Sequence, residues 1–321
     1  MISGINNMAV YYYNGDKYFF FGDLHKQNNH PCRGYCDHFN YQFTDIETYH
    51  NDCTAIGPLL YYWLNYNELN HIETHLYIEE SWTTKPITYY DPIYKEINKR
   101  EPYHNFDTVF PFQDMSWLEL TSALLNRDQF HVNHVDIRAV DGHHVDPFHL
   151  VPDVSYVTFL IEHYQAIFKE LLLNQSSVTH PIYEEKLQLM RPILPLNVND
   201  DIYNFIINLC NEYMAPVVDN YYTKLNWYFE YDDEYSMPAF MAYYQNHFTV
   251  LSAYLMDAYV LSTIFKSTGE KIIYTGAYHI EIYQLYFKHL GIKPLFIAPT
   301  QEMKCIKTDI IPIQKYRNAW K

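Results

Sequence analysis

The stretch that decides the fold is KIIYTGAYHIEIYQLYFKHLGIKPLFIA, residues 271–298. Within it, the pattern predicts a buried strand at Lys271–Thr275, a helix at Tyr278–Leu290 and a second strand at Leu295–Ala298. Gly291 suits the residue that follows a helix, because glycine adopts the left-handed conformation at low cost. A strand, a helix and a strand within about 30 residues form a βαβ crossover, which indicates a parallel sheet with helices on its faces.

The rest of the chain extends this pattern in both directions along the sequence. Upstream we expect three strands, at Tyr18–Gly22, His75–Glu79 and His131–Arg138. We also expect two helices there, at Thr54–Asn70 and Trp117–Asn126. Between them and the crossover we expect four helices: Ser155–Asn174, Ile182–Met190, Asp200–Met214 and Pro238–Lys266. The sequence predicts one α/β domain over residues 1–321, with a mostly parallel central sheet and helices on both faces. N-terminal strands and loops occupy residues 1–150, a helical insertion 151–267 and the βαβ unit 268–321.

Composition excludes several classes of protein. Hydrophobic residues make up 48% of the chain and charged residues 19%, which is typical of a folded globular protein. The net charge of −16 disfavours nucleic acid as a partner, and nine glycines leave little room for a glycine-rich phosphate loop. The longest apolar run, Thr249–Phe265, carries Asp257 near its middle, so we expect a buried helix and no membrane span. The N-terminal residues do not resemble a signal peptide, so secretion is not expected.

Two copies of one motif follow predicted strands. Gly22-Asp23-Leu24-His25 follows the first strand, and Gly276-Ala277-Tyr278-His279 follows Lys271–Thr275. Ligands of parallel sheets bind beyond the carboxyl ends of the strands, and each glycine allows the chain to turn there. We therefore expect His25 and His279 to meet at one edge of the sheet as ligands of a divalent metal ion. For either histidine, a hydrogen-bonded structural role is the alternative.

Charged residues at the ends of the other strands complete this predicted site. The second strand ends in Glu79-Glu80, and alternation lets only one of the two face the edge. We expect Glu80 and Asp23 to be the catalytic carboxylates beside the metal, where one could act as general base toward a metal-activated water. Arg138 is the candidate contact for an anionic substrate group, although Asp136 and Arg138 share a face and could form an ion pair instead.

Three segments together resemble a known α/β superfamily. They are FFFGDLH at Phe19–His25, the Glu79-Glu80 strand end, and IIYTGAYHIEIYQLYFKHLGI at Ile272–Ile292. The superfamily groups the TIKI and TraB/PrgY proteins, the ChaN-like haem-binding lipoproteins and the erythromycin-esterase-like hydrolases. Its members carry one Gly-x-x-His after the first strand and another before a late helix.

The resemblance implies a function and a set of cofactors. TIKI members are metal-dependent proteases, which implies a metal site at His25 and His279, and the esterase branch uses His and Glu to activate water. Asp23 stands where many members have Glu, and its side chain is shorter by one methylene. The ChaN-like branch implies haem as an alternative cofactor, with Tyr278 or a histidine as axial ligand.

A second resemblance concerns origin. The phrases FGDLH, VDIR and MDAYVLSTIF before TGAYH are similar to uncharacterised giant-virus proteins. This similarity implies a location in the host cytoplasm or the virion. It also offers an alternative function, a non-catalytic viral protein that uses the scaffold for assembly or host-factor binding.

The leading hypothesis is a metal-dependent hydrolase that acts on a peptide or small-molecule substrate by cleaving a peptide, ester or other acyl bond. Two further clusters stay open. Cys32, Cys36 and Cys53 are compatible with a zinc site, a disulfide or free thiols. Asp141–His149 is dense in metal-ligand residue types, and it suits either a metal site or a flexible polar loop.

Overall fold

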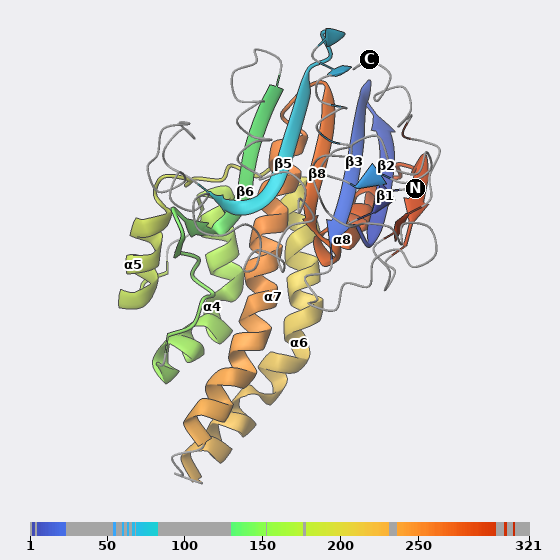
Figure 1. Ribbon diagram of the computed structural model, residues 1–321. Helices are drawn as coiled ribbons and strands as arrows, with labels where there is room; N and C mark the ends of the chain where they lie inside the picture. Colours follow the sequence, from blue (N-terminus) through green and yellow to red (C-terminus); the bar gives the residue numbers. More distant parts are fainter. Residues whose placement is uncertain are drawn as a thin grey trace, which may run out of the picture. The chain divides into compact units, whose positions relative to one another are not determined.

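The computed structural model (Figure 1) divides the chain into two compact units. The first comprises Met1–Glu79, Lys85–Asn133 and Ser267–Lys321, and the second comprises Glu80–Thr84 and His134–Lys266. The structure describes residues 2–3, 5–23, 54–55, 60, 63, 66–67, 69–82, 130–151, 153–175, 178–230, 236–299, 305–306 and 311.

The central sheet is parallel in its middle. Its strands are β2 (Asn7–Tyr13), β3 (Asp16–Asp23), β5 (Thr74–Trp82), β6 (Phe130–Val140), β7 (His143–His144), β8 (Glu270–Gly276) and β9 (Phe296–Ala298). They follow the order β7-β6-β5-β8-β3-β2-β9. β8 pairs parallel with both β3 and β5, whereas the antiparallel pairs β2–β3, β2–β9 and β6–β7 lie toward the two ends. The predicted fold class, α/β with a mostly parallel sheet and a helical insertion, is confirmed.

Helical residues cover both faces of the first unit's sheet. On one face, Trp63 packs edge-on against Phe19 with ring centroids 4.4 Å apart, within a buried apolar cluster. On the other, α8 (Ala277–His289) places Phe287 against Tyr11 and Phe20, at 4.5 and 5.4 Å. Alternation along β2 and β3 separates these two sets of side chains. The sheet is therefore buried on both faces, as the apolar runs of its strands predict.

The chain enters the sheet through a hairpin that we did not predict. β2 and β3 are joined by Asn14-Gly15, whose φ angles of 52° and 91° lie in the left-handed region. Asn-Gly is the preferred pair for a two-residue hairpin turn, because both residues tolerate positive φ. The signal for the hairpin was therefore present in the sequence at Asn14-Gly15.

The βαβ crossover has the predicted direction but a wider span. β9 is antiparallel to β2, which is antiparallel to β3, so β9 runs in the same direction as β8. The hairpin β2–β3 lies between the two strands of the crossover. The expected strand–helix–strand order therefore holds, and the strands are not neighbours.

A small second sheet corrects one predicted helix. β1 (Ile2–Ser3) pairs parallel with β4 (Thr54–Ala55) and antiparallel with β10 (Cys305–Ile306). The expected helix over Thr54–Asn70 was thus wrong at its start, and the described helical residues begin at Leu60. Thr54 favours a strand and Ala55 favours a helix, so the pairing of both residues with β1 overrides the local helical pattern. The other helix expected upstream, Trp117–Asn126, lies outside the described residues.

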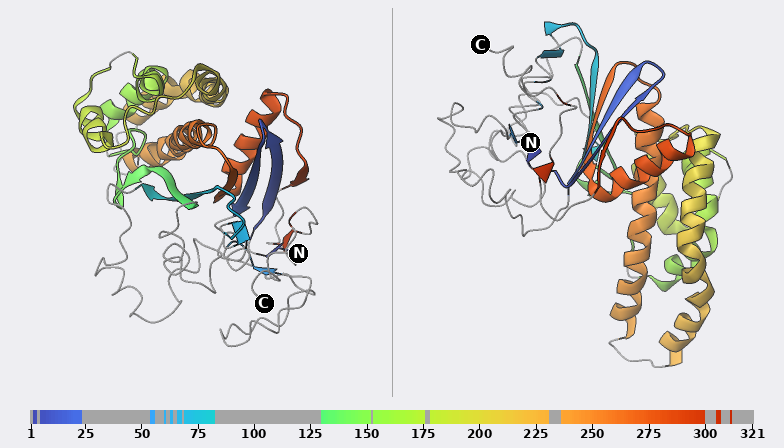
Figure 2. Two further views of the ribbon diagram at one scale, coloured as in Figure 1. Left: turned by 90° about the horizontal axis from the view of Figure 1, so that it is seen from above. Right: turned by 90° about the vertical axis from the view of Figure 1, so that its right-hand side faces the viewer.

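The second unit holds the helical insertion, with α6 and α7 side by side (Figure 2). Its helices are α4 (Val154–Leu173), α5 (Pro181–Met190), α6 (Asp200–Glu230) and α7 (Ser236–Ile264). Asn199 caps α6, since its Oδ1 accepts from the Ile202 N–H at 2.8 Å. The predicted end of this helix at Met214 was wrong, because the helix continues through Pro216.

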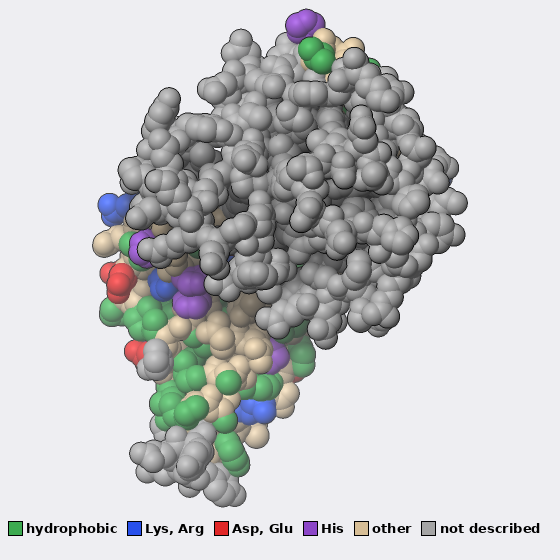
Figure 3. Space-filling view, in the orientation of Figure 1, with side chains coloured by type: hydrophobic (Ala, Val, Ile, Leu, Met, Phe, Trp, Pro, Cys, Tyr) green, Lys and Arg blue, Asp and Glu red, His purple; other side chains and the backbone are tan. Residues whose placement is uncertain are grey.

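Burial explains the apolar run in α7. Asp257 is fully buried within the second unit, as are most of the apolar residues around it. No helix among the described residues has both the length and the hydropathy to cross a bilayer. On the face drawn in Figure 3, hydrophobic side chains lie in groups among polar atoms on the described surface.

Candidate functional site

The carboxyl ends of β3 and β8 bring the two Gly-x-x-His segments together at the level of the backbone. Gly22 pairs with Thr275, and Asp23 pairs with Gly276, in a parallel register. The strand ends from which both motifs leave the sheet are therefore neighbours, although some 250 positions separate them in sequence. β5 lies on the other side of β8 and contributes its own carboxyl end to the same edge (Figure 1).

Gly22 is required by close approach at this edge. A Cβ atom at residue 22 would lie 1.8 Å from Oδ1 of Asn7 and 2.8 Å from Cα of Ala277. Asn7 is fully buried, and its Nδ2 donates to the carbonyl of Ala277 at 3.0 Å. Any larger residue would push the first turn of α8 away from β3.

A carboxylate–imidazole pair lies next to this contact. Nε2 of His279 is 3.4 Å from Oε1 of Glu79, and the two side chains are only 7% and 13% exposed. Oε2 of Glu79 accepts from the backbone N–H of Gly276 at 2.6 Å. Gly276 is the N-cap of α8 and has no side-chain cap of its own, so Glu79 supplies an anion where the helix dipole favours one.

The structure describes some of the predicted site residues and leaves others undescribed. His279 lies at the expected edge, in the first turn of α8. Asp23 is the last residue of β3, and Glu80 lies near the end of β5. The side chains of both fall outside the described part of the structure, as does all of His25. The carboxylate beside His279 is that of Glu79, whereas we predicted Glu80 as the catalytic residue.

Arg138 forms the ion pair that was the alternative to an anion contact. Its Nε and Nη2 donate to the two oxygens of Asp136 at 2.6 and 3.0 Å, a bidentate geometry. Both side chains are about one-fifth exposed. The two residues share a face of β6, as strand alternation predicts.

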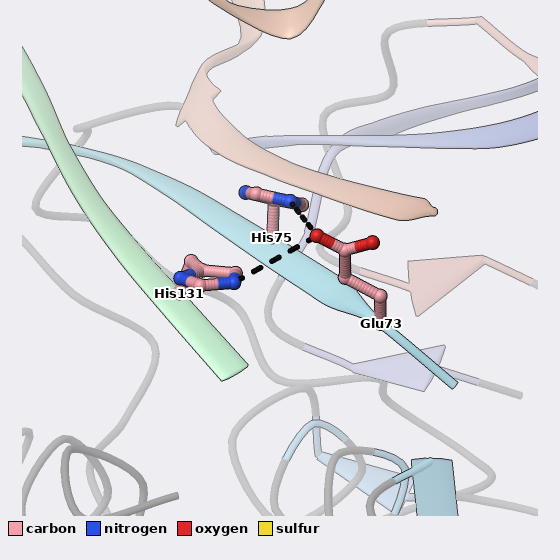
Figure 4. Close-up of side chains that lie close together, drawn as sticks. All are labelled: Glu73, His75 and His131. Atoms are coloured by element: carbon pink, nitrogen blue, oxygen red, sulfur yellow. Dashed lines mark hydrogen bonds and ion pairs between the residues drawn. The ribbon is translucent and has the colours of Figure 1, made fainter. Parts of the chain in front are cut away.

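A second cluster lies at the opposite, amino-terminal edge of the sheet, and the sequence did not suggest it (Figure 4). Glu73 precedes β5, His75 is the second residue of β5, and His131 is the second residue of β6. Nε2 of His75 and Nε2 of His131 lie 3.4 and 3.8 Å from the same oxygen, Oε1 of Glu73. The two imidazole rings stack with centroids 4.5 Å apart.

The loop before β8 holds Glu73 in place. Thr268 Oγ1 donates to Oε2 of Glu73 at 2.9 Å, which leaves Oε1 for the two histidines. The Glu270 N–H donates to the Glu73 carbonyl at 2.9 Å. Gly269 has a φ of +85°, and a Cβ there would lie 2.4 Å from that carbonyl oxygen. Glycine is therefore required at residue 269 for both reasons.

The electrostatics of this amino-edge cluster favour the forms that bind metals. The hydrogen bond from Thr268 lowers the pKa of Glu73, and the neighbouring imidazoles act in the same direction. Burial lowers the pKa of His75, and the charge of His131 adds to the effect. At neutral pH the cluster thus presents an anionic carboxylate and an uncharged His75 imidazole.

The other clusters noted in the sequence form no comparable group within the described part of the chain. In the Asp141–His149 segment, His144 and His149 stack at 4.5 Å, while Asp146 is buried and accepts from Ser252. Cys32, Cys36 and Cys53 lie outside the described residues. Among the residues that are described, only Glu73, His75 and His131 bring three ligand atoms of this kind within 4.8 Å of one another.

Comparison with known proteins adds no further constraint. No protein-family model, no curated protein and no solved structure matches the chain. The structure itself supports one statement about cofactors: the Glu73–His75–His131 cluster could hold a metal ion. A histidine occupies the second position of both β5 and β6, which is a signal for this cluster in the sequence. The rule for ligand binding by parallel sheets concerns the carboxyl ends of strands, so it does not point to these residues.

Proposed function

We propose that this protein is a metal-dependent hydrolase that cleaves a peptide, ester or other acyl bond at the carboxyl edge of β3, β5 and β8. The observation that carries the proposal is the buried contact between His279 and Glu79 at that edge. It lies where the strand ends leading into both Gly-x-x-His motifs are paired in register. Parallel sheets bind their ligands at this edge.

The donor set fits a divalent metal ion. A neutral imidazole is a common zinc ligand, and a carboxylate close to the ion can serve as general base toward its bound water. His279 Nε2 lies 3.4 Å from Glu79 Oε1, so a water on an ion held by His279 would lie close to that carboxylate. Bound there, an ion would polarise the scissile carbonyl and lower the pKa of a water molecule.

The residues of the chain have separate tasks in this proposal. His279 would hold the ion, from a position fixed by the first turn of α8. Glu79 takes a proton from the attacking water and returns it to the leaving group, as a general base and then a general acid. The Gly276 N–H fixes one Glu79 oxygen, so the other stays directed toward His279. His25 remains the predicted further ligand.

Kinetic measurements on variants test this function. Protein without a histidine tag would be assayed with chromogenic acyl esters and fluorogenic peptides, before and after chelation and zinc return. We expect chelator-sensitive hydrolysis and a fall of roughly 10²-fold or more in kcat for Glu79→Gln. We expect His279→Ala to lose the metal equivalent of the carboxyl edge together with the activity. Glu184→Gln, an exposed change on α5, is the control that keeps full activity.

Two results would overturn the proposal. One is hydrolysis that is absent from folded, zinc-loaded protein with every ester and peptide, which would favour the non-catalytic alternative. The other is a Glu79→Gln variant as active as wild type. Amide chemical shifts of the first turn of α8 report whether Glu79→Gln disturbs the helix cap. If activity is lost while these shifts stay unchanged, Glu79 has a chemical role beyond capping the helix.

A further inference from the structure

We propose that Glu73, His75 and His131 form a second metal-ion site, specific for a divalent transition metal of the zinc class. It lies at the amino edge of the sheet, so it is independent of the hydrolytic site proposed at the carboxyl edge. The ion has three protein ligands and a fourth position open to solvent. It fastens the amino ends of β5 and β6 to each other.

The distances match such a site before any ion binds. Both imidazole nitrogens approach the same carboxylate oxygen, at 3.4 Å for His75 and 3.8 Å for His131. Two ligands of a tetrahedral zinc ion are separated by roughly 3.4 Å. Figure 4 shows the two rings and the carboxylate converging from β5, β6 and the residue before β5. All three ligand atoms lie within 4.8 Å of one another, so the imidazole rings must turn and close by up to about 1.4 Å to reach this spacing.

Ligand chemistry narrows the choice of ion. Imidazole nitrogen suits zinc and its neighbours in the transition series, whereas calcium and magnesium prefer sites made of oxygen ligands. Two histidines and one glutamate are also the ligands of one group of open zinc sites. The carboxylate and His131 are 46% and 48% exposed, so solvent can reach the fourth position.

Outer contacts hold the ligands in position. Thr268 engages the second oxygen of Glu73, and His75 also stacks on Tyr77 with ring centroids 6.1 Å apart. Partners of this kind orient metal ligands and raise affinity. The nearby ammonium of Lys271 is paired with Asp16, which offsets its repulsion of a cation.

Binding would join segments that are far apart in sequence. His131 stands at the start of β6, and His75 at the start of β5, with residues 83–129 between the two strands. Asn133 already links the strands through a 3.4 Å contact of its Nδ2 with the Leu76 carbonyl. An ion bound to the folded state adds stability that grows with its concentration.

Calorimetric titration tests the site. Full-length protein without a histidine tag would be stripped with a chelator and titrated with Zn²⁺ alone, and Co²⁺ would report tetrahedral geometry through its visible spectrum. We expect the His75→Ala/His131→Ala double variant to lose one zinc equivalent relative to wild type. Glu73→Gln, which keeps the shape of the side chain, should lose the same equivalent and retain the fold by circular dichroism.

Matched controls make the result specific. His144→Ala/His149→Ala removes another pair of imidazoles stacked at 4.5 Å, and it should bind as much zinc as wild type. His279→Ala should keep the amino-edge equivalent, so failure of the hydrolytic proposal is distinguishable from failure of this one. The proposal is overturned if wild type binds no zinc, or if Glu73→Gln and the double variant both bind as wild type does.

Discussion

The two edges of the sheet use the same residue types in different surroundings. At the carboxyl edge, Glu79 and His279 are almost wholly buried, and a helix N-terminus holds the carboxylate. At the amino edge, Glu73 and His131 are half exposed, and a threonine hydroxyl holds the carboxylate. In both, one oxygen is fixed by a donor and the other faces an imidazole at 3.4 Å.

The difference in burial indicates what each edge is suited to do. A buried pair beneath the first turn of a helix is suited to acid–base chemistry, because charges interact more strongly where bulk solvent is kept away. A half-exposed cluster with an additional histidine is suited to capturing an ion from solution. Each edge also depends on one glycine, at which the backbones come too close for any side chain.

The largest expected effect is at the glycine of the carboxyl edge. Gly22→Ala would place a methyl group against Asn7 Oδ1 and the Ala277 backbone, at 1.8 and 2.8 Å. We expect a loss of about 3 kcal/mol in the free energy of unfolding, the upper part of the range for overpacking. Urea denaturation measures it. A change within about 0.5 kcal/mol, as for a neutral surface substitution, would show that the edge is loosely packed.

The glycine of the amino edge should give a smaller loss. Gly269→Ala combines a positive φ with a 2.4 Å approach to the Glu73 carbonyl, whereas Gly291→Ala has a positive φ and open space. Left-handed backbone alone costs about 1–2 kcal/mol. We expect the unfolding free energy of Gly269→Ala to fall further than that of Gly291→Ala, together with weaker zinc binding. Equal losses for the two variants would mean that the loop yields without moving Glu73.

Thr268 gives a finer test of the amino edge. Thr268→Val keeps the shape of the side chain but removes the hydrogen bond to Glu73 Oε2. We expect zinc affinity to fall roughly 10-fold, as for other partners of metal ligands. Thr263→Val, which loses a 2.8 Å bond to the Tyr259 carbonyl within α7, is the control and should bind zinc normally. Unchanged affinity for Thr268→Val would separate Thr268 from the site.

The smallest expected effect concerns a buried carboxylate outside both edges. Asp146 accepts from Ser252 Oγ and the Phe148 N–H, and burial raises its pKa. Its ionisation therefore opposes folding. The protonated form of Asp146 contributes stability at low pH, and this contribution is lost as pH rises from the pKa of the unfolded state through the pKa of the folded state. Asp146→Asn keeps both acceptor contacts but cannot ionise. Thermal unfolding at several pH values should therefore show the stability of the variant rising relative to that of wild type as pH rises. A constant difference would contradict this.

Much of the fold could be predicted from local patterns. The apolar runs of β3, β5 and β8 are buried on both faces, and the helical insertion follows from its periodicity and from caps such as Asn199. The β2–β3 hairpin was missed despite Asn14-Gly15. Strand order was beyond local reasoning, because inserting that hairpin inside the crossover is a tertiary choice.

The candidate site could be predicted only in part. The rule for parallel sheets led to His279 and to the end of β5, but choosing between Glu79 and Glu80 depends on the twist of one strand. The amino-edge cluster required knowing that β5 and β6 begin side by side and that residue 73 turns back toward them. The histidines at the second positions of β5 and β6 are visible in the sequence, but the approach of Glu73 to both of them is seen only in three dimensions.

Anomalous diffraction at the zinc absorption edge, from crystals of the zinc-loaded protein, tests the central claim most directly. We predict one peak within about 2.0–2.2 Å of ligand atoms of Glu73, His75 and His131, and another beside His279 and Glu79 at the opposite edge. Zinc bound elsewhere, with neither edge occupied, would contradict it.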